Sequence, residues 1–178
     1  MEIIAFRLGH RIPRDERITT HVCLVARAFG ANSVLYSGQK DHSLEKSVSG
    51  IVENWGGTFS IEHEKSPLKL LKDLKKDGFS IVHLTMYGIP IEEKKSALSG
   101  LKKAVVIVGG EKVPPEIYEM ADYNIAVGSQ PHSEVAALAI CLDRMMEGEE
   151  LERKFDSRFK GKICLEPAEK GKKIKKRS

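Results

Sequence analysis

Hydrophobic positions along most of the chain switch repeatedly between a strand-like and a helix-like spacing. Compact apolar runs such as 102–110 are typical of buried strands, whereas apolar residues recur every three or four positions in segments such as 15–31. Glycine closes several of the helical segments, as expected at helix C-termini. We therefore expect strands at 2–8, 33–37, 58–63, 79–88, 102–110 and 122–128, and helices at 15–31, 42–57, 66–78, 91–100, 114–121 and 133–151.

The regular alternation of these elements predicts the fold class. It favours an α/β domain with a mostly parallel sheet and helices on both faces. A chain of 178 residues is expected to form one domain, which we place at 1–168. From about residue 149 the pattern breaks down, and residues 169–178 lack apolar periodicity. We expect this last segment to be a basic, disordered tail.

Two helix starts carry recognisable N-terminal signals. Ser66 is expected to cap a helix whose first turn contains Pro67. By the same reasoning, Pro131 fits the first turn of the last helix, with Ser129 or Gln130 as its cap.

Charge is distributed unevenly along the chain. The net charge is +4, but residues 169–178 alone carry +5, which leaves −1 for the rest. This tail either attracts a polyanion without specificity or serves as a solubilising terminus. The first 39 residues contain no lysine, but they do contain Arg7, Arg11, Arg14, Arg17 and Arg27. The planar guanidinium suits phosphates, carboxylates and base edges, so the cluster indicates either such recognition or ordinary salt bridges with nearby acids.

Several functional classes are disfavoured by what the sequence lacks. No apolar run approaches the roughly 20 residues of a membrane span, and the N-terminus does not read as a secretory signal, so we expect a cytoplasmic protein. Three widely spaced cysteines and six histidines show no metal-ligand spacing, so we expect no metal. Nucleophile-elbow, dinucleotide-binding and P-loop patterns do not occur either.

Three of the expected strands end in loops of unusual composition. These loops are 83–90, 108–115 and 127–134. In open parallel sheets, ligands bind outside the carboxyl ends of the strands. If these strands are parallel neighbours, all three loops lie at one edge of the sheet and form a candidate ligand site.

The residues in these loops suggest what such a ligand would be. Gly109 and Gly110 permit close backbone approach, Glu111 could accept hydrogen bonds from ribose hydroxyls, and Lys112 could offset a carboxylate. The alternative is a plain strand-to-helix turn in which the glycines only relieve steric crowding. In the third loop, exposed N–H groups at a helix start could hold a polar or anionic group.

Several long segments of the chain resemble a known family, and the resemblance covers roughly residues 1–165. RLGHRIPRDERITTHVCLVARAFGA, VGGEKVPPEIYEMADYNIAVGSQPHSEVAALAI and LDRM are similar to the archaeal tRNA (cytidine(56)-2'-O)-methyltransferases, of the SPOUT class. The resemblance implies a sheet with a C-terminal trefoil knot at about 79–146, a homodimer, a tRNA substrate and S-adenosylmethionine as methyl donor. The cofactor-binding residues that it implies are Leu84, Gly109, Gly110, Glu111, Lys112, Val113, Val127, Gly128, Ser129, Gln130, Pro131, His132, Ser133 and Glu134.

The resemblance also implies a mechanism in which a ribose 2'-hydroxyl attacks the donor's methyl group in line. Related SPOUT enzymes use an arginine of the helix after the first strand, but the simplest overlay here places Leu24 at that position. We expect Arg17 to take this catalytic role, with Arg27 as second candidate, and Arg11 and Arg14 to bind RNA. Two alternatives stay open at this point: a non-catalytic RNA- or nucleotide-binding module, and another cofactor protein such as a small flavodoxin-like one.

Overall fold

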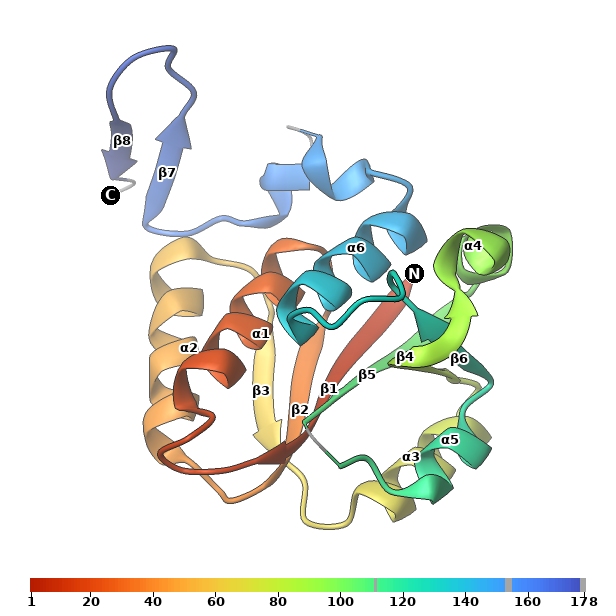
Figure 1. Ribbon diagram of the computed structural model, residues 1–178. Helices are drawn as coiled ribbons and strands as arrows, with labels where there is room; N and C mark the ends of the chain where they lie inside the picture. The colour runs from red at the N-terminus through yellow and green to blue at the C-terminus, as the bar shows by residue number, and fades with distance from the viewer. Residues whose placement is uncertain (111, 153–154, 177–178) are drawn as a thin grey trace.

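The computed structural model contains a six-stranded sheet in which all neighbouring strands run parallel (Figure 1). It describes residues 1–110, 112–152 and 155–176. The strand order is β3-β2-β1-β5-β4-β6, so β1 and β5 lie at the centre and are the most thoroughly buried. The strands are β1 Glu2–His10, β2 Ser33–Gly38, β3 Ser60–His63, β4 Ser80–Pro90, β5 Lys103–Gly109 and β6 Tyr123–Ala126.

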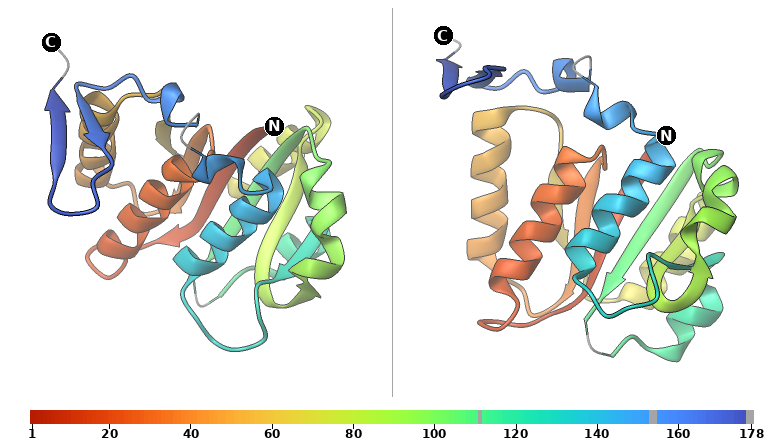
Figure 2. Two further views of the ribbon diagram at one scale, coloured as in Figure 1. Left: turned by 90° about the horizontal axis from the view of Figure 1, so that it is seen from above. Right: turned by 45° about the horizontal axis from the view of Figure 1, so that its top comes forward.

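Helices cover both faces of this sheet, as the alternation predicts (Figure 2). One face packs against α1 Glu16–Ala28, α2 His42–Trp55, α4 Ile91–Ser99 and α6 Glu134–Met146, around a large apolar core. The other face packs against α3 Pro67–Lys76 and α5 Pro115–Met120, around a smaller core that includes Phe6, Leu71 and Ile117. The predicted fold class is thus confirmed.

The order of the strands decides where the three unusual loops lie. Because β5, β4 and β6 are adjacent and parallel, their carboxyl ends meet at one edge of the sheet, as expected. β4 continues beyond its neighbours, and its pairing with β6 shifts register between Leu84 and Ile89. The residues between them therefore leave the regular ladder and bend over the edge of the sheet.

The helix starts show which of the expected caps form. At α2, Asp41 caps the helix through a 3.0 Å bond that its Oδ1 accepts from the Leu44 N–H. Ser66 does precede α3, but its side chain makes no capping bond. The last helix, α6, starts at Glu134, within one residue of the expected start, but Ser133 is its cap. Pro131 therefore lies outside the helix, and the expected cap at Ser129 or Gln130 is wrong, because the Ser133 side chain accepts the capping bond from the Val135 N–H.

The C-terminal segment contains more structure than its polar composition suggests. After the short 3-10 helices Glu149–Leu151 and Phe155–Arg158, the strands β7 Ile163–Glu166 and β8 Lys173–Lys176 pair antiparallel. The expected disorder from residue 169 is wrong for this part: the structure places a strand there, because backbone pairing with β7 supplies hydrogen bonds that apolar periodicity does not reveal. The segment joins the body near the end of α2, where the Gly161 backbone packs against Gly56 and Lys162 pairs with Glu53 at 2.5 Å.

Within the described part of the chain, no helix is long and apolar enough to cross a membrane. The trefoil knot implied for about 79–146 stays a prediction.

Candidate functional site

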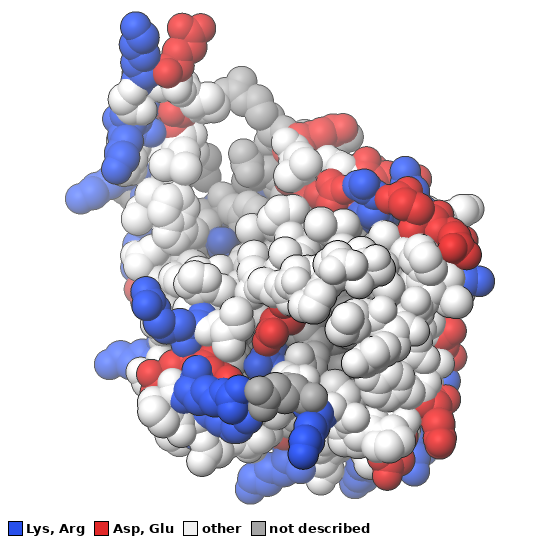
Figure 3. Space-filling model, viewed as in Figure 1, with Lys and Arg blue, Asp and Glu red and all other residues white. Residues whose placement is uncertain are grey.

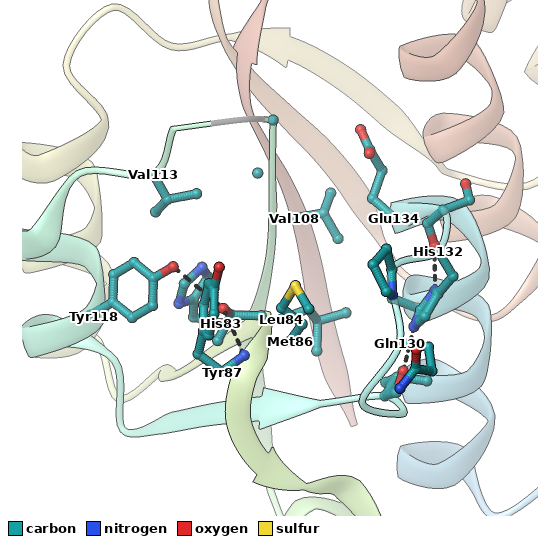
Figure 4. A pocket seen from close by; sticks show the side chains of 17 residues that line it. His83, Leu84, Met86, Tyr87, Val108, Val113, Tyr118, Gln130, His132 and Glu134 are labelled. Atoms are coloured by element: carbon teal, nitrogen blue, oxygen red, sulfur yellow. Dashed lines mark hydrogen bonds between the residues drawn. The ribbon is translucent and has the colours of Figure 1, made fainter.

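The loops at the ends of β4, β5 and β6 enclose a cavity of about 330 Å³, here named the first cavity (Figure 4). Four segments form its walls. The end of β4 supplies His83 to Tyr87, the β5 loop supplies Val108 to Gly110 with Val113, and Tyr118 belongs to α5. The fourth wall is the segment Gln130–Glu134, which leads into α6. The cavity is thus built from segments that lie far apart in the sequence.

Most residues that the resemblance assigns to the cofactor lie at the first cavity. Those that line it are Leu84, Gly109, Gly110, Val113, Val127, Gln130, Pro131, His132, Ser133 and Glu134. Three others do not line it: Gly128 and Ser129 lie in the same loop, and Lys112 faces a neighbouring cavity. Glu111 falls outside the described residues.

Glycine at position 109 is required by the geometry of the β5 loop. A Cβ atom at Gly109 would overlap Cγ2 of Val113, which closes back over the end of the strand. At Gly110, an added Cβ would lie 3.5 Å from Nη1 of Arg7 and 3.9 Å from Nη2 of Arg11. A side chain at position 109 would therefore displace Val113, whereas a Cβ at position 110 would make only ordinary contacts.

His83 places an unused hydrogen-bond acceptor at the wall of the first cavity. The Asn124 amide donates to the Tyr118 carbonyl at 2.9 Å, which leaves its Oδ1 to accept from His83 Nδ1 at 2.8 Å. His83 then carries its proton on Nδ1, so that Nε2 is an acceptor; this buried atom has no partner among the described residues. Burial lowers the pKa of His83 and keeps the ring neutral, although the hydrogen bond that His83 donates to Asn124 opposes this shift.

His132 holds its own loop in place. Its ring lies between the carbonyl oxygens of Val127 and Ser133, with Nδ1 3.1 Å from the latter. Nε2 contacts the Val127 oxygen, which brings the start and the end of the loop together. This arrangement gives His132 a structural part in shaping the cavity wall.

Arg7 and Tyr118 belong to the surroundings of the site, but the sequence patterns did not assign them to it. Arg7, on β1, is buried and pairs with Glu134 at 3.0 Å. Tyr118 packs edge-on against His83, with ring centroids 4.6 Å apart, and its hydroxyl lies 3.3 Å from Thr85 Oγ1. An arginine within an apolar strand was a usable signal for Arg7, whereas nothing in its local sequence marks Tyr118.

A second cavity, of about 520 Å³, adjoins the first at Gly110. The ends of β1 and β2 form it, together with the β5 loop. The residues that line it are Leu8, Gly9, His10, Arg11, Gly38, Gln39, Gly110 and Lys112. Arg11 stands on its wall and is held by Asp15 through bonds of 2.9 Å and 3.4 Å. The hydrogen bond from Arg11 lowers the pKa of Asp15, although burial opposes this shift. The carboxylate of Asp15 and the guanidinium of Arg11 are therefore both charged.

His10, the last residue of β1, ties three elements together beneath the second cavity. Its Nδ1 lies 2.9 Å from Thr19 Oγ1 in α1, and its Nε2 lies 3.3 Å from Asp41 Oδ2. Burial raises the pKa of Asp41, but hydrogen bonds from the Leu44 backbone and His10 outweigh it and leave the pKa lowered. Both nitrogens of the buried ring are therefore engaged within the protein.

Arg17 and Arg27, the two candidates for the catalytic arginine, lie at different ends of α1 and make different contacts. Arg17 is exposed near the start of α1, where it lines a third, shallow cavity with His21 and residues of α2. Arg27 lies ten positions further along the helix, roughly 15 Å away along its axis. There it donates to the Gly56 carbonyl at 2.6 Å and stacks on the Phe159 ring at 4.6 Å. Burial lowers its pKa, and these contacts tie it to the C-terminal segment.

The part of the chain that the structure describes contains no group of three or more His, Cys, Asp or Glu side chains placed to hold a metal ion. Two of the three cysteines, Cys23 and Cys141, are buried, and burial raises the pKa of both thiols to about 12. These two thiols fill core space in the protonated form.

Solved structures with similar folds include RNA methyltransferases. A tRNA modifying enzyme from A. aeolicus, of the TrmH/SpoU type, aligns with a TM-score of 0.66 and 20% identity, over 88% of this chain and 79% of that one. The methyltransferase AviRb from Streptomyces viridochromogenes, in complex with AdoMet, aligns at 0.56 and 13%, over 82% and 56%. At these identities the likeness concerns the fold, which is of the SPOUT type.

Sequence relatives are much closer. The tRNA (cytidine(56)-2'-O)-methyltransferase of Methanopyrus kandleri is 51% identical over 173 residues, covering 97% of this chain and 96% of the relative. That of Methanocaldococcus jannaschii is 50% identical over 175 residues, covering 97% and 95%. A family model described as tRNA ribose 2'-O-methyltransferase, aTrm56, matches residues 55–175. The chain therefore belongs to the aTrm56 family of tRNA ribose 2'-O-methyltransferases.

Proposed function

We propose that this protein transfers a methyl group from S-adenosylmethionine to the ribose 2'-hydroxyl of cytidine 56 in the T loop of tRNA. The observation that carries the proposal is the first cavity. Its glycine-bearing wall and its α6 loop are built from the segments by which the chain resembles its family. Relatives about 50% identical over almost the full length carry this activity in their names.

The residues at the first cavity suit the methyl donor. A nucleoside needs room against bare backbone and partners for its N–H and O–H groups. Gly109 and Gly110 provide that room, and His83 Nε2 is a buried acceptor without a partner among the described residues. Leu84, Val113 and Val127 add apolar surface for an adenine ring. The cavity thus offers what an adenosine-containing ligand requires.

S-adenosylmethionine would supply a methyl group on a positively charged sulfonium, which a ribose hydroxyl can attack without a metal. The protein's own part is then orientation, since near-attack placement of two reactants accounts for much of such catalysis. The β5 loop and the segment before α6 hold one reactant between them. The Arg7–Glu134 ion pair fixes the start of α6 relative to the sheet, and thereby the width of this gap.

We propose Arg17 as the arginine that acts on the acceptor nucleotide, with Arg27 as the weaker candidate. Arg17 is exposed near the start of α1, just after the connection from β1 that carries Arg11 and Arg14. Figure 3 shows Lys and Arg side chains gathered in the lower part of the molecule, the part that includes the loops at the strand ends. Arg11 and Arg14 would grip the RNA backbone there, and the lysines of β8 and its turn would add nonspecific attraction.

The active form is proposed to be a homodimer working on tRNA in the cytoplasm. Uncharged side chains dominate the middle of the face in Figure 3. Met86, Tyr87 and Ile89 at the end of β4 and Ile140 on α6 are apolar and 42–81% exposed. Such a group of exposed apolar side chains beside a site favours burial by a second copy. Light scattering at micromolar concentration would report a mass near twice 19.8 kDa if this holds.

Methyl mapping on tRNA tests the proposed reaction directly. The protein is incubated with an unmodified tRNA transcript and labelled S-adenosylmethionine, and the modified nucleotide is located. The expected product is 2'-O-methylcytidine at position 56, and a matched transcript with deoxycytidine at that position should accept no label. Labelling elsewhere would assign another target. Failure of S-adenosylhomocysteine to bind in calorimetry would favour the RNA-binding module instead.

A further inference from the structure

Glu150 carries a buried carboxyl group that the proposed reaction does not use. It lies in the 3-10 helix Glu149–Leu151, directly after α6, and only 6% of its surface is exposed. Both of its carboxyl oxygens are buried, and neither has a hydrogen-bond partner in the described part of the chain. Burying an unpaired charge is strongly unfavourable, so this group needs either a counter-charge or a proton.

The polar side chain that faces Glu150 is another carboxyl group. Asp143, in the last turn of α6, lies within hydrogen-bonding reach of it. Two carboxylates cannot bond to each other, because both of them only accept. With one proton between them, one oxygen becomes a donor and the other remains an acceptor. A shared proton therefore accounts for two acid groups that lie together without a donor at Glu150.

Arg144 decides which of the two acid groups keeps its charge. Its Nη1 donates to Asp143 Oδ2 at 2.6 Å. Its Nε donates to Glu92 Oε1 at the start of α4 at 2.7 Å, so the guanidinium is held in place from two sides. Because a guanidinium only donates, it favours Asp143 as the charged acceptor. The shared proton then belongs on Glu150.

The remaining surroundings of Glu150 also favour its neutral form. Burial raises the pKa of Glu150, and the carboxyl groups of Asp143 and Glu149 raise it further, whereas the backbone N–H of Glu150 itself opposes these effects. Arg158, on the following 3-10 helix, stacks instead on the Phe155 ring, with its guanidinium carbon 4.5 Å from the ring centroid. The nearby cations are thus engaged elsewhere.

The chain that follows Glu150 is seated on the body at two places. Phe155 is buried, and a Cβ added at Gly30 would lie 3.2 Å from its ring. Further along, a Cβ added at Gly161 would overlap the backbone of Trp55, at the end of α2. Trp55 is the single tryptophan of the protein, so its fluorescence should report whether this segment is seated.

We propose that Glu150 is protonated at neutral pH and donates to Asp143, and that this bond is a proton-dependent latch that holds residues 155–176 on the body. Loss of the proton would place two charges side by side at the end of α6, where the helix carbonyls add partial negative charge. The latch should then open and release the segment. This inference does not depend on the methyl-transfer reaction.

The direction of the pH dependence follows from the raised pKa. The folded chain binds the proton more tightly than the unfolded chain, in which the group has its ordinary pKa of 4.5. The latch is therefore fully stabilising below pH 4.5, and its contribution is lost as the pH rises through the raised pKa. Within that window, the equilibrium constant for seating the segment should fall by up to about tenfold per pH unit.

Two variants make the latch independent of the proton. In Glu150→Gln, the amide takes the place of the protonated acid and can donate to Asp143 at every pH. In Asp143→Asn, the amide can donate to an ionised Glu150, so the pair again needs no proton. The matched control is Glu149→Gln, the same change at the neighbouring residue, which is exposed.

The test follows Trp55 fluorescence of the full chain from about pH 5 to about pH 9, in the presence of EDTA. We expect the wild type to show one step with a midpoint above about pH 7, and Glu149→Gln to retain it. Glu150→Gln and Asp143→Asn should show no step, and if the first fails to fold, the second decides.

Three results would overturn the proposal. The first is a wild-type midpoint below neutrality or no step at all, because Glu150 would then not exchange a proton as proposed. The second is a step of wild-type size in Glu150→Gln. The third is a fluorescence change that follows added Mg²⁺ and not pH, which would mean that a metal ion and not a proton neutralises the two acid groups.

Discussion

Arg7 Nη2 and Glu134 Oε1 lie 3.0 Å apart and join the central strand β1 to the first turn of α6. The arginine is almost fully buried, with 1% of its surface exposed, and it also donates from Nη1 to the Leu8 carbonyl at 2.6 Å. Its Nε has no partner among the described residues. A charge buried this deeply depends on its carboxylate partner, so the pair fixes where α6 begins relative to the sheet.

Removing the carboxylate should destabilise the protein and loosen the first cavity. Loss of one partner of a buried pair costs about 3–5 kcal/mol, and because Glu134 is 27% exposed we expect roughly 2 kcal/mol for Glu134→Gln. Urea unfolding measures this cost, and calorimetry should show weaker S-adenosylhomocysteine binding. In a double-mutant cycle with Arg7→Met, the two effects should be non-additive by about 1 kcal/mol or more. Strict additivity would mean that the two side chains act independently.

A methyl group at position 109 should damage the cofactor site more than the fold. In Gly109→Ala, the new Cβ overlaps Val113 Cγ2, so the β5 loop must move away from the strand. We expect at least a tenfold rise in the Kd for S-adenosylhomocysteine and a stability loss of about 1–3 kcal/mol, as for other overpacked sites. The double variant Gly109→Ala/Val113→Ala removes the overlapping atom and should recover most of the stability. If it does not, the overlap is not the cause.

Stability should fall in weak acid because of His83. Burial lowers its pKa below the ordinary value of 6.5, so below that pH the unfolded chain binds a proton that the folded chain does not. The stabilisation is therefore complete above pH 6.5 and is lost as the pH falls towards the lowered pKa. Urea midpoints at about pH 7.5 and about pH 5.5 should drop further for the wild type than for His83→Gln, which does not titrate. Equal drops would show that His83 is solvated or charged in the native state.

The sequence predicted the sheet well because its signals are local. Each buried strand is a short apolar run, each helix shows its own period, and parallel strands follow from their alternation. The meeting of the β4, β5 and β6 loops also followed, since all parallel strands end at one edge. That inference assumed only that the three strands are neighbours, and it did not need the order of the other strands.

What could not be predicted depends on contacts between distant segments. The cap of α6 was misplaced because Pro131 suits a first helical turn, whereas the helix begins only at Glu134 and Ser133 caps it. β8 was missed because its polar sequence has no apolar periodicity, and its pairing with the backbone of β7 leaves no local signal. The second cavity arises from the ends of β1 and β2 with Gly110, three segments that no local pattern connects.

The structure provides a way to decide between the two arginines of α1. Arg17 is exposed on the surface of α1, so Arg17→Ala should leave the free energy of unfolding within about 0.5 kcal/mol of the wild type. If it acts on the acceptor, turnover should fall at least a hundredfold while S-adenosylhomocysteine binds normally.

Arg27 is the matched control, because it is the same residue in the same helix with different contacts. Arg27→Ala loses the bond to the Gly56 carbonyl and the stacking on Phe159, so we expect it to cost about 1–2 kcal/mol of stability. At a temperature where both variants remain folded, its turnover should stay near that of the wild type, since its side chain points toward the C-terminal segment. A loss of turnover in Arg27→Ala, with normal turnover in Arg17→Ala, would reverse the assignment.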